Sequence, residues 1–215
     1  MNNKPRQVTI GVLGFQGDIE ENIAAARQAM KELDVDGTVK IVRYPEEFEN
    51  IDGLVMPGGE STVQSTLAAI QQSLPVVKKK IGDGMPVLGT CAGMIMLSKR
   101  AFDRVIGDTK QKLMGNLDVV IERNAFGRQN DSFETEMDIP AFGKEPFKGV
   151  FIRAPAVTEV GKDVEVISRF NNRVVAVKQG NIMGTAFHPE LSGDNRVHKQ
   201  LVQMAVKFRN KEKES

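Results

Sequence analysis

Residues 86–97, PVLGTCAGMIML, place the only cysteine of the chain between a short apolar run and a longer apolar stretch. The run PVLG has the composition of a short buried strand, and the residues after Cys91 have the apolar spacing of a helix. Gly89 and Gly93 stand two positions before and after the cysteine, where a sharp strand-to-helix turn needs residues without bulky side chains. We therefore expect a buried strand, a strained turn that exposes the Cys91 thiol above a sheet, and a helix.

Strand and helix patterns also alternate on the N-terminal side of this segment. Helical spacing follows Gly17 and begins again at Ser61, and a further helix is expected over residues 76–81. Apolar runs predict strands over residues 8–15, 40–43 and 52–56, the last of which ends at a Pro-Gly-Gly breaker. The buried face predicted for the helix after the breaker is Val63, Leu67 and Ile70.

From residue 117 onward the pattern changes to short β-rich runs, each bounded by turn-forming residues. An amphipathic helix is predicted over residues 193–209, followed by a frayed polar tail over residues 210–215. The β-rich runs are LDVVIE (117–122), SFETEMDI (132–139), GVFIRA (149–154), VEVISRF (164–170), RVVAVKQ (173–179) and NIMGTAFH (181–188).

Together these patterns predict an α/β fold. Strands that alternate with helices indicate three layers, with a mostly parallel central sheet, helices on both faces and right-handed crossovers, as in flavodoxin-like folds. A β-rich second half extends this arrangement, and residues 1–215 are expected to form a single domain. Functional sites in such folds lie at the carboxyl ends of the strands.

Composition and charge exclude several classes of protein. Hydrophobic residues make up 40% and charged residues 27% of the 215 residues, so neither disorder nor a membrane protein is indicated. The formal net charge is +1 and basic residues are interspersed with acidic ones, so we expect no nucleic-acid partner. No run has membrane-spanning length and the first seven residues lack a signal-peptide pattern. A single cysteine suits a reducing, cytoplasmic setting.

The Cys91 turn has two interpretations. In the first, the thiol is a nucleophile, because a helix N-terminus favours the reactive thiolate and the Ala92 N–H is available as an oxyanion-hole donor. In the second, the cysteine is a small buried hydrophobe, and the glycines only tighten a turn. The pentapeptide alone does not separate the two, so the decision depends on finding a base.

Two histidines are the candidates for that base. His188 ends a predicted strand, and Glu190 stands two residues later, where an extended chain directs both side chains to the same side. Glu190 can then fix the imidazole tautomer while the ring faces the thiol. A surface histidine beside an acid is the alternative for this pair. For His198, inside the final helix, we expect a solvated position.

Three motifs occur in an order that resembles class I (triad) glutamine amidotransferases: PGGEST (57–62), GTCAG (89–93) and HPE (188–190). Further stretches resemble one family in particular, the glutaminase subunits of pyridoxal 5′-phosphate synthase (the PdxT/SNO family). The resemblance extends from about residue 8 to the last helix. The further stretches are QG (16–17), ERN (122–124), FGRQ (126–129) and VFIRAP (150–155).

The resemblance assigns a role to each matching residue. It implies Cys91 as nucleophile, His188 as general base and acid, and Glu190 as the residue that orients the histidine. The N–H groups of Gly59 and Ala92 are expected to form the oxyanion hole.

The resemblance also implies a glutamine pocket. Arg123 is expected to bind the substrate α-carboxylate, and a surface ion pair is the alternative for either arginine of the pocket. The implied lining is Gly59, Glu60, Ser61, Arg123, Ile152 and Arg153.

The implied reaction is hydrolysis of L-glutamine to L-glutamate and ammonia, without a metal or cofactor. The ammonia is expected to pass directly to a barrel-shaped synthase subunit in a large hetero-oligomer that makes pyridoxal 5′-phosphate. Two alternatives stay open. One is a glutaminase subunit that serves another synthase, such as a histidine-pathway cyclase, and the other is a non-catalytic sensor with the same cysteine turn.

Two segments depart from the family pattern. Residues 31–38 are longer and residues 18–22 more acidic than this pattern suggests. Both segments are expected to lie away from the triad and to affect docking.

Overall fold

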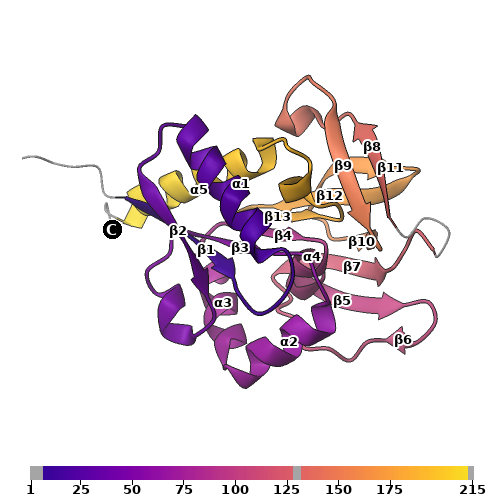
Figure 1. Cartoon of the computed structure of the whole chain (residues 1–215). Helices are drawn as coiled ribbons and strands as arrows, with labels where there is room; N and C mark the ends of the chain where they lie inside the picture. Colours follow the sequence, from indigo (N-terminus) through magenta and orange to yellow (C-terminus); the bar gives the residue numbers. More distant parts are fainter. Residues whose placement is uncertain (1–6, 128–131, 213–215) are drawn as a thin grey trace, which may run out of the picture.

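Four apolar runs from the N-terminal half and one from the C-terminal half form the parallel part of the main sheet (Figure 1). The computed structural model describes residues 7–127 and 132–212, and within these the parallel strands lie in the order β2-β1-β3-β4-β13. This is the flavodoxin-like order, and its reversal at β1 and β3 creates a crevice at the carboxyl ends of these strands. Their bounds are β1 Val8–Leu13, β2 Gly37–Val42, β3 Gly53–Met56, β4 Val87–Thr90 and β13 Ile182–Thr185.

Helices cover both faces of this sheet and complete the three predicted layers (Figure 1). The first and last long helices, α1 and α5, pack against each other on one face, and α2, α3 and α4 lie on the other. In the described part of the chain, no helix combines the length and apolar character needed to cross a membrane. The helix bounds are α1 Ile19–Glu32, α2 Ser61–Ile70, α3 Ser73–Gly82, α4 Ala92–Leu97 and α5 Arg196–Glu212, with 3₁₀ turns at η1 Pro45–Phe48, η3 Pro140–Phe142 and η4 Pro189–Leu191.

Beyond β13 the main sheet continues with mostly antiparallel strands, in the order β12-β10-β7-β5-β6, and β11 pairs with β12. A separate antiparallel pair, β8 and β9, stands above this half of the sheet (Figure 1). The strand bounds are β5 Ser98–Asp103, β6 Gly107–Asp108, β7 Leu117–Arg123, β8 Ser132–Met137, β9 Phe147–Ile152, β10 Ala156–Val160, β11 Glu165–Phe170 and β12 Arg173–Gln179.

Phenylalanine side chains attach the β8–β9 pair to the rest of the molecule. The rings of Phe133 and Phe151 stack with centroids 4.7 Å apart, and Phe151 meets Phe187, at the end of β13, edge-on at 5.7 Å. Aromatic contacts of this geometry add to the stabilisation that comes from burying the rings. They fix the carboxyl end of β9 beside the end of β13.

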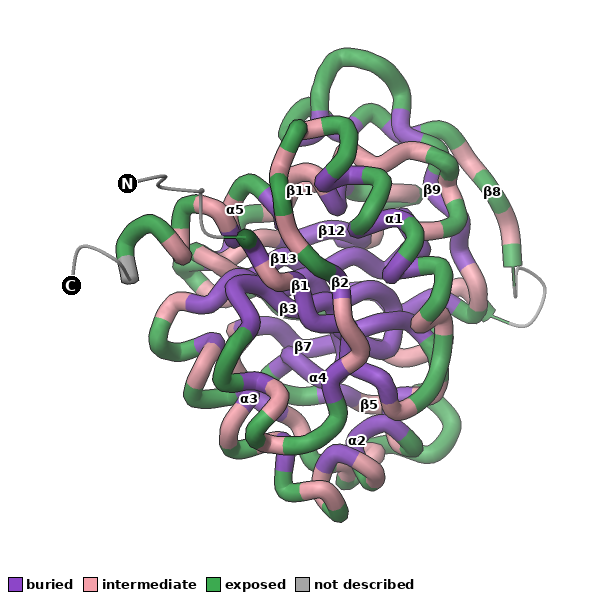
Figure 2. The backbone as a smooth tube through the Cα atoms, turned by 60° about the vertical axis from the view of Figure 1, so that its left-hand side comes forward, coloured by how far each residue is buried: buried purple, intermediate pink, exposed green. Residues whose placement is uncertain are grey.

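The deepest part of the core lies around the parallel strands and α4 (Figure 2). Every residue of α4 is buried, which agrees with its uniformly apolar sequence. Because α4 contacts β3, β4 and β13, the residue that begins it is held at the centre of the sheet.

The predicted buried face of α2 is wrong. Val63 and Ile70 are 43% and 66% exposed, whereas Gln64 is fully buried. The amide nitrogen of Gln64 donates to the carbonyl oxygens of Gln16, Pro57 and Gly58. The helix therefore turns its polar side to two loops that need hydrogen-bond donors, and its apolar side faces outward.

The C-terminal helix begins and ends three residues later than the sequence pattern predicts, at Arg196 and Glu212 and not at residues 193 and 209. It continues to Glu212, so residues 210–212 of the expected polar tail are helical. Residues 213–215 lie outside the described residues, as do residues 1–6 and the Arg-Gln pair of the FGRQ stretch.

Candidate active site

The turn that carries Cys91 has the strained geometry that the sequence predicts. Cys91 has φ 47° and ψ −104°, and its N–H donates to the Thr185 carbonyl over 2.7 Å. A β-carbon on Gly93 would lie 1.9 Å from the Met56 carbonyl oxygen, and one on Gly89 would lie 2.7 Å from the backbone of Gly93. The two glycines are therefore required by close backbone approach, and only they let the turn fit against β3.

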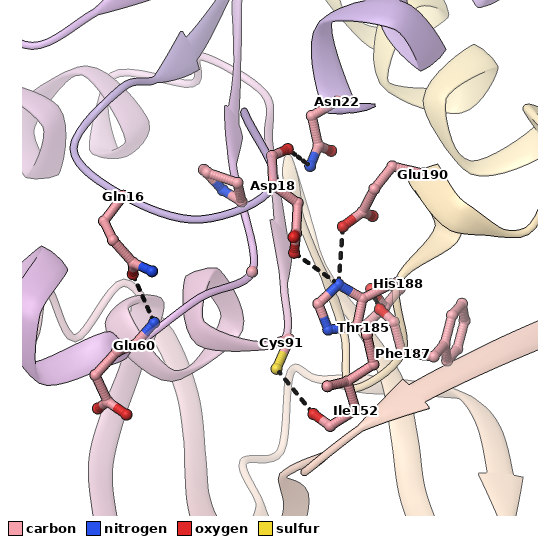
Figure 3. A network of polar contacts seen from close by, with 12 residues as sticks. Gln16, Asp18, Asn22, Glu60, Cys91, Ile152, Thr185, Phe187, His188 and Glu190 are labelled. Atoms are coloured by element: carbon pink, nitrogen blue, oxygen red, sulfur yellow. Dashed lines mark hydrogen bonds and ion pairs between the residues drawn. The ribbon is translucent and has the colours of Figure 1, made fainter. Parts of the chain in front are cut away.

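His188 and Glu190 meet as predicted, but the local backbone differs from the expectation. The Nδ1 atom of His188 lies 2.9 Å from Glu190 Oε1 (Figure 3). The residues from Pro189 onward form the 3₁₀ turn η4 and not an extended segment, because proline starts such a turn readily. The His188 N–H donates to the Val150 carbonyl over 2.8 Å, which ties the histidine to β9.

A second carboxylate contacts the same imidazole nitrogen. Asp18 Oδ2 lies 3.0 Å from His188 Nδ1 (Figure 3). Burial lowers the pKa of His188, but the hydrogen bonds to Asp18 and Glu190 and the electrostatic interaction with Cys91 outweigh burial and raise this pKa to about 12. The hydrogen bond to His188 in turn holds the pKa of Asp18 below its usual range. The imidazole is therefore strongly basic, and its proton is shared with acidic neighbours.

The other ring nitrogen faces the thiol. His188 Nε2 is buried and makes no hydrogen bond to any described residue, and it points to the side of Cys91 (Figure 3). The Cys91 sulfur lies 4.0 Å from the Ile152 carbonyl oxygen. Thiol, imidazole and carboxylate thus follow one another in the order needed for a nucleophile, its base and an orienting acid.

A cavity of about 250 Å³ opens over the thiol. It contains the cysteine and histidine together with all six residues predicted to line the glutamine pocket. Glu190 and Ala92 do not line it, and the Glu190 side chain is fully buried behind the imidazole. The lining residues are Gln16, Asp18, Gly59, Glu60, Ser61, Cys91, Ile95, Arg123, Asn124, Ile152, Arg153 and His188.

Comparison with known families agrees with this geometry. The SNO glutamine amidotransferase family matches residues 12–207. The chain belongs to this family. The match includes the cysteine turn, the glycine-rich loop and the histidine, so it covers the whole cavity.

Individual relatives of this SNO-family chain are similar over nearly its full length. It is 48% identical over 195 residues to a pyridoxal 5′-phosphate synthase subunit PdxT of Nitrosopumilus maritimus (strain SCM1), covering 91% of this chain and 95% of the relative. It is 49% identical over 201 residues to the subunit of that name from Thermococcus kodakarensis (strain ATCC BAA-918 / JCM 12380 / KOD1), covering 93% and 100%. A solved structure, described as a glutamine amidotransferase, has a TM-score of 0.80 and 39% identity, covering 91% of this chain and 98% of that one.

In this SNO-family chain, Arg123 does form an ion pair, with Glu60, and the pair lies in the wall of the cavity. Its Nη2 atom lies 2.6 Å from Glu60 Oε1, and the Arg123 side chain is only 13% exposed. Glu60 also caps α2 by accepting a hydrogen bond from the Thr62 N–H over 3.3 Å. The cavity therefore holds one guanidinium and one carboxylate side by side, both positioned by the protein.

The loop after β1 is the part of the amidotransferase site that sequence reasoning left out. Gln16 Oε1 accepts from the Glu60 N–H over 2.7 Å, and Asp18 reaches His188. The expectation that residues 18–22 lie away from the triad is therefore wrong for Asp18. The strand order contains the missing signal, because β1 and β3 are neighbours and their carboxyl ends share one edge. Residues 31–38, by contrast, join α1 to β2 at the opposite end of the sheet.

The prediction for the second histidine is also wrong. His198 is fully buried and its Nε2 atom lies 3.1 Å from Asn22 Oδ1. Burial lowers the pKa of His198 to about 4. The helical position is not solvated because α5 packs this face against α1.

Asp18, His188 and Glu190 also have the spacing of a cation site, with one potential ligand atom each within 4.8 Å of one another. A metal ion would need the Nδ1 lone pair, which requires a neutral imidazole. The raised pKa of His188 works against that state. We therefore interpret the three groups as a hydrogen-bonded acid–base network.

Proposed function

We propose that the chain is the glutaminase subunit of a pyridoxal 5′-phosphate synthase, and that it hydrolyses L-glutamine to L-glutamate and ammonia. The observation that carries this proposal is the Cys91 thiol on its strained turn, facing His188 inside a cavity that also holds Arg123 and Glu60. The matching relatives, named as subunits of that synthase, support the choice of pathway.

The first half of the reaction forms a thioester. In the resting site His188 is an imidazolium whose Nε2 holds the proton given up by the Cys91 thiol, and the sulfur attacks the carbon of the glutamine side-chain amide. The resulting tetrahedral intermediate carries its negative charge on the former carbonyl oxygen. Backbone N–H groups of Gly59 and Ala92 are the proposed donors to that oxygen. Collapse of the intermediate expels ammonia, which leaves with the proton returned by His188 Nε2.

The second half regenerates the sulfur nucleophile. His188 removes a proton from a water molecule, which attacks the thioester carbon and passes through a second oxyanion. Glutamate leaves as the carbon–sulfur bond breaks, and His188 keeps the proton taken from water and is again the imidazolium. Glu190 stays hydrogen-bonded to Nδ1 throughout and keeps Nε2 directed at the reacting atoms. One glutamine and one water thus yield one glutamate and one ammonia.

The Arg123–Glu60 pair suits the amino-acid end of the substrate. The guanidinium of Arg123 can bind the α-carboxylate through charge-assisted hydrogen bonds, and the Glu60 carboxylate can bind the α-ammonium group. The two groups lie 2.6 Å apart in the free protein and would each exchange that contact for a substrate group. Ser61, Ile152 and Arg153 complete the proposed pocket around the side chain of glutamine.

The proposed partner is a barrel synthase subunit in a large cytoplasmic hetero-oligomer. Free ammonia is protonated in water and loses its nucleophilicity, so direct transfer to the enzyme that consumes it is chemically favourable. The outward apolar side of α2, with Val63 and Ile70 exposed, begins at the cavity rim and offers a surface for protein contact.

The test is glutamate release by wild type and Cys91→Ala, each measured with and without the synthase subunit that matches this chain. We expect Cys91→Ala to lose activity by at least about 10³-fold, because no other described side chain of the cavity is a nucleophile of comparable strength. Cys91→Ser is the matched variant, since it keeps the size of the side chain and replaces the thiol. Wild-type glutamate release by purified Cys91→Ala would refute the mechanism. Equal wild-type rates with and without the synthase would count against the partner.

A further inference from the structure

The loop between β1 and α1 brings an acidic group to the base of the proposed glutaminase. Asp18 Oδ2 lies 3.0 Å from His188 Nδ1, and Glu190 Oε1 lies 2.9 Å from the same atom. The nitrogen can carry one hydrogen, so the two carboxylates share it in a three-centre arrangement (Figure 3). A triad of cysteine, histidine and glutamate accounts for only one of the two carboxylates, that of Glu190.

Helix capping does not explain Asp18. The residue stands at the N-cap of α1, where an aspartate side chain usually accepts a hydrogen bond from the first turn. Here the side chain makes no such bond and turns toward the imidazole. Its backbone carbonyl is held instead by the Asn22 side chain, which donates over 2.7 Å. The carboxylate is thus directed away from its ordinary role in the helix.

Close packing fixes the carboxylate against the ring. A β-carbon on Gly58 would lie 2.3 Å from His188 Cε1 and 2.6 Å from Asp18 Oδ2. A β-carbon on Gly17 would lie 1.7 Å from the Gly58 carbonyl oxygen. The loop after β1 and the glycine-rich loop after β3 therefore pack backbone to backbone, and the imidazole edge and the Asp18 carboxylate lie directly against Gly58.

The two carboxylates differ in their surroundings. The Glu190 side chain is fully buried behind the ring, whereas the Asp18 side chain is 31% exposed and lines the cavity. The charged or titratable groups that face the ring are Asp18 from the loop before α1, Glu190 from η4 and Cys91 from the turn before α4. Asp18 is thus the acidic neighbour of His188 on the substrate side.

We propose that Asp18 is a second positioning residue of His188, which shares the Nδ1 hydrogen with Glu190, stabilises the imidazolium form and keeps Nε2 turned toward Cys91. This inference rests on the proposed glutaminase function. Asp18 acts through the histidine and not on the substrate itself, so its loss is expected to affect turnover and the titration of His188 more than glutamine binding.

The experiment compares Asp18→Asn with wild type in the full-length chain. The substitution keeps the shape of the side chain and removes its charge. We expect turnover to fall about tenfold with KM within about twofold, and the titration midpoint of His188 to move down by about one pH unit, because one of its two anionic partners is lost. The midpoint is read by NMR of labelled histidine, and the chain contains only two histidines.

Glu21→Gln is the matched control, because it removes a charge from the exposed face of the same first turn. The His198 resonance serves as the check that Asp18→Asn is folded, and Asp18→Glu is expected to recover part of the titration shift. If Asp18→Asn leaves both turnover and the His188 midpoint as in Glu21→Gln, the proposal is wrong. A loss of turnover with an unmoved His188 midpoint would also overturn it, since that pattern indicates a structural role only. The titration requires no glutamine hydrolysis, so its outcome is independent of the Cys91→Ala test.

Discussion

The two histidines of the chain are buried to nearly the same extent, with exposed fractions of 3% for His188 and 0% for His198, yet their proton affinities are shifted in opposite directions. Burial disfavours the charged imidazolium at both sites. Two carboxylates and a thiol overcome this effect at His188, whereas the neutral amide of Asn22 does not at His198. The charge of the hydrogen-bond partners, and not the depth of burial, therefore determines whether a buried histidine is strongly basic or stays neutral.

The largest expected difference between the two sites is catalytic. His188→Asn keeps a donor near the position of Nδ1 and removes the Nε2 base, so we expect glutamine hydrolysis to fall by about 10³-fold. His198→Gln keeps a donor toward Asn22 and is expected to leave turnover within about twofold, because His198 does not line the cavity. Steady-state glutamate release from both variants, with the synthase present, measures the contrast. Comparable losses in the two variants would show that the comparison is wrong.

The next largest effect is on the free energy of unfolding, to which His198 and His188 contribute with different dependence on pH. The pKa of His198 is about 4 in the folded chain, against about 6.5 for an unperturbed histidine. Between these values the unfolded chain takes up a proton that the folded chain does not, so lowering the pH reduces the free energy of unfolding by up to about 3 kcal/mol. His188 adds no slope in this window, because its raised pKa leaves it protonated in both states.

Urea unfolding at a series of pH values tests this expectation. In wild type, the free energy of unfolding should fall between about pH 6.5 and pH 4, in part because His198 takes up a proton on unfolding. His198→Gln should lose that part of the fall, while the carboxylates contribute equally in both proteins. The stabilisation from His188 has the opposite sign, since it is present below its unfolded pKa and is lost as the pH rises toward about 12. Parallel curves for wild type and His198→Gln would refute the assignment of His198 as a buried neutral group.

The smallest expected effect comes from a substitution that gives His198 a carboxylate partner, as His188 has. Asn22→Asp places a carboxylate next to His198 Nε2, where the amide oxygen now lies 3.1 Å away. We expect the titration midpoint of His198 to rise by at least about one pH unit, because an adjacent anion favours the imidazolium. NMR titration of His198 measures the change, and Gln28→Glu, on the exposed side of α1, is the matched control. An unchanged midpoint would mean that burial alone determines this site.

The sequence allowed the parallel half of the fold to be predicted because its strands are short, mainly apolar runs, and several of them adjoin glycine or proline, as β1 does at Gly14 and β3 at Pro57. The strands β5, β6 and β10 were not predicted. The sequence SKRAFD of β5 carries adjacent basic residues, and its place near the edge of the sheet leaves them in solvent. Apolar spacing also misassigned the buried face of α2, since periodicity does not show which side a loop will cover.

The same limit, that a sequence pattern does not show contacts across the fold, explains which residues of the site could be predicted. Cys91, His188 and Glu190 could be found because each occurs in a short motif at a predicted strand end, and the structure brings them together. Asp18 and His198 could not, because their roles depend on contacts across the fold, from the loop before α1 to the segment between β13 and η4 and from α5 to α1. Residue types alone do not distinguish an aspartate that caps a helix from one that faces an imidazole.

Cys91 is the only cysteine of the chain, and its thiol opens into the cavity and not onto the outer surface. A thiol-specific chromogenic reagent will therefore be consumed at most once per chain, and only by molecules whose Cys91 is still a free thiol. The number of equivalents consumed gives the fraction of chains whose nucleophile is neither oxidised nor blocked, so turnover numbers can be expressed per free thiol without a tight-binding inhibitor.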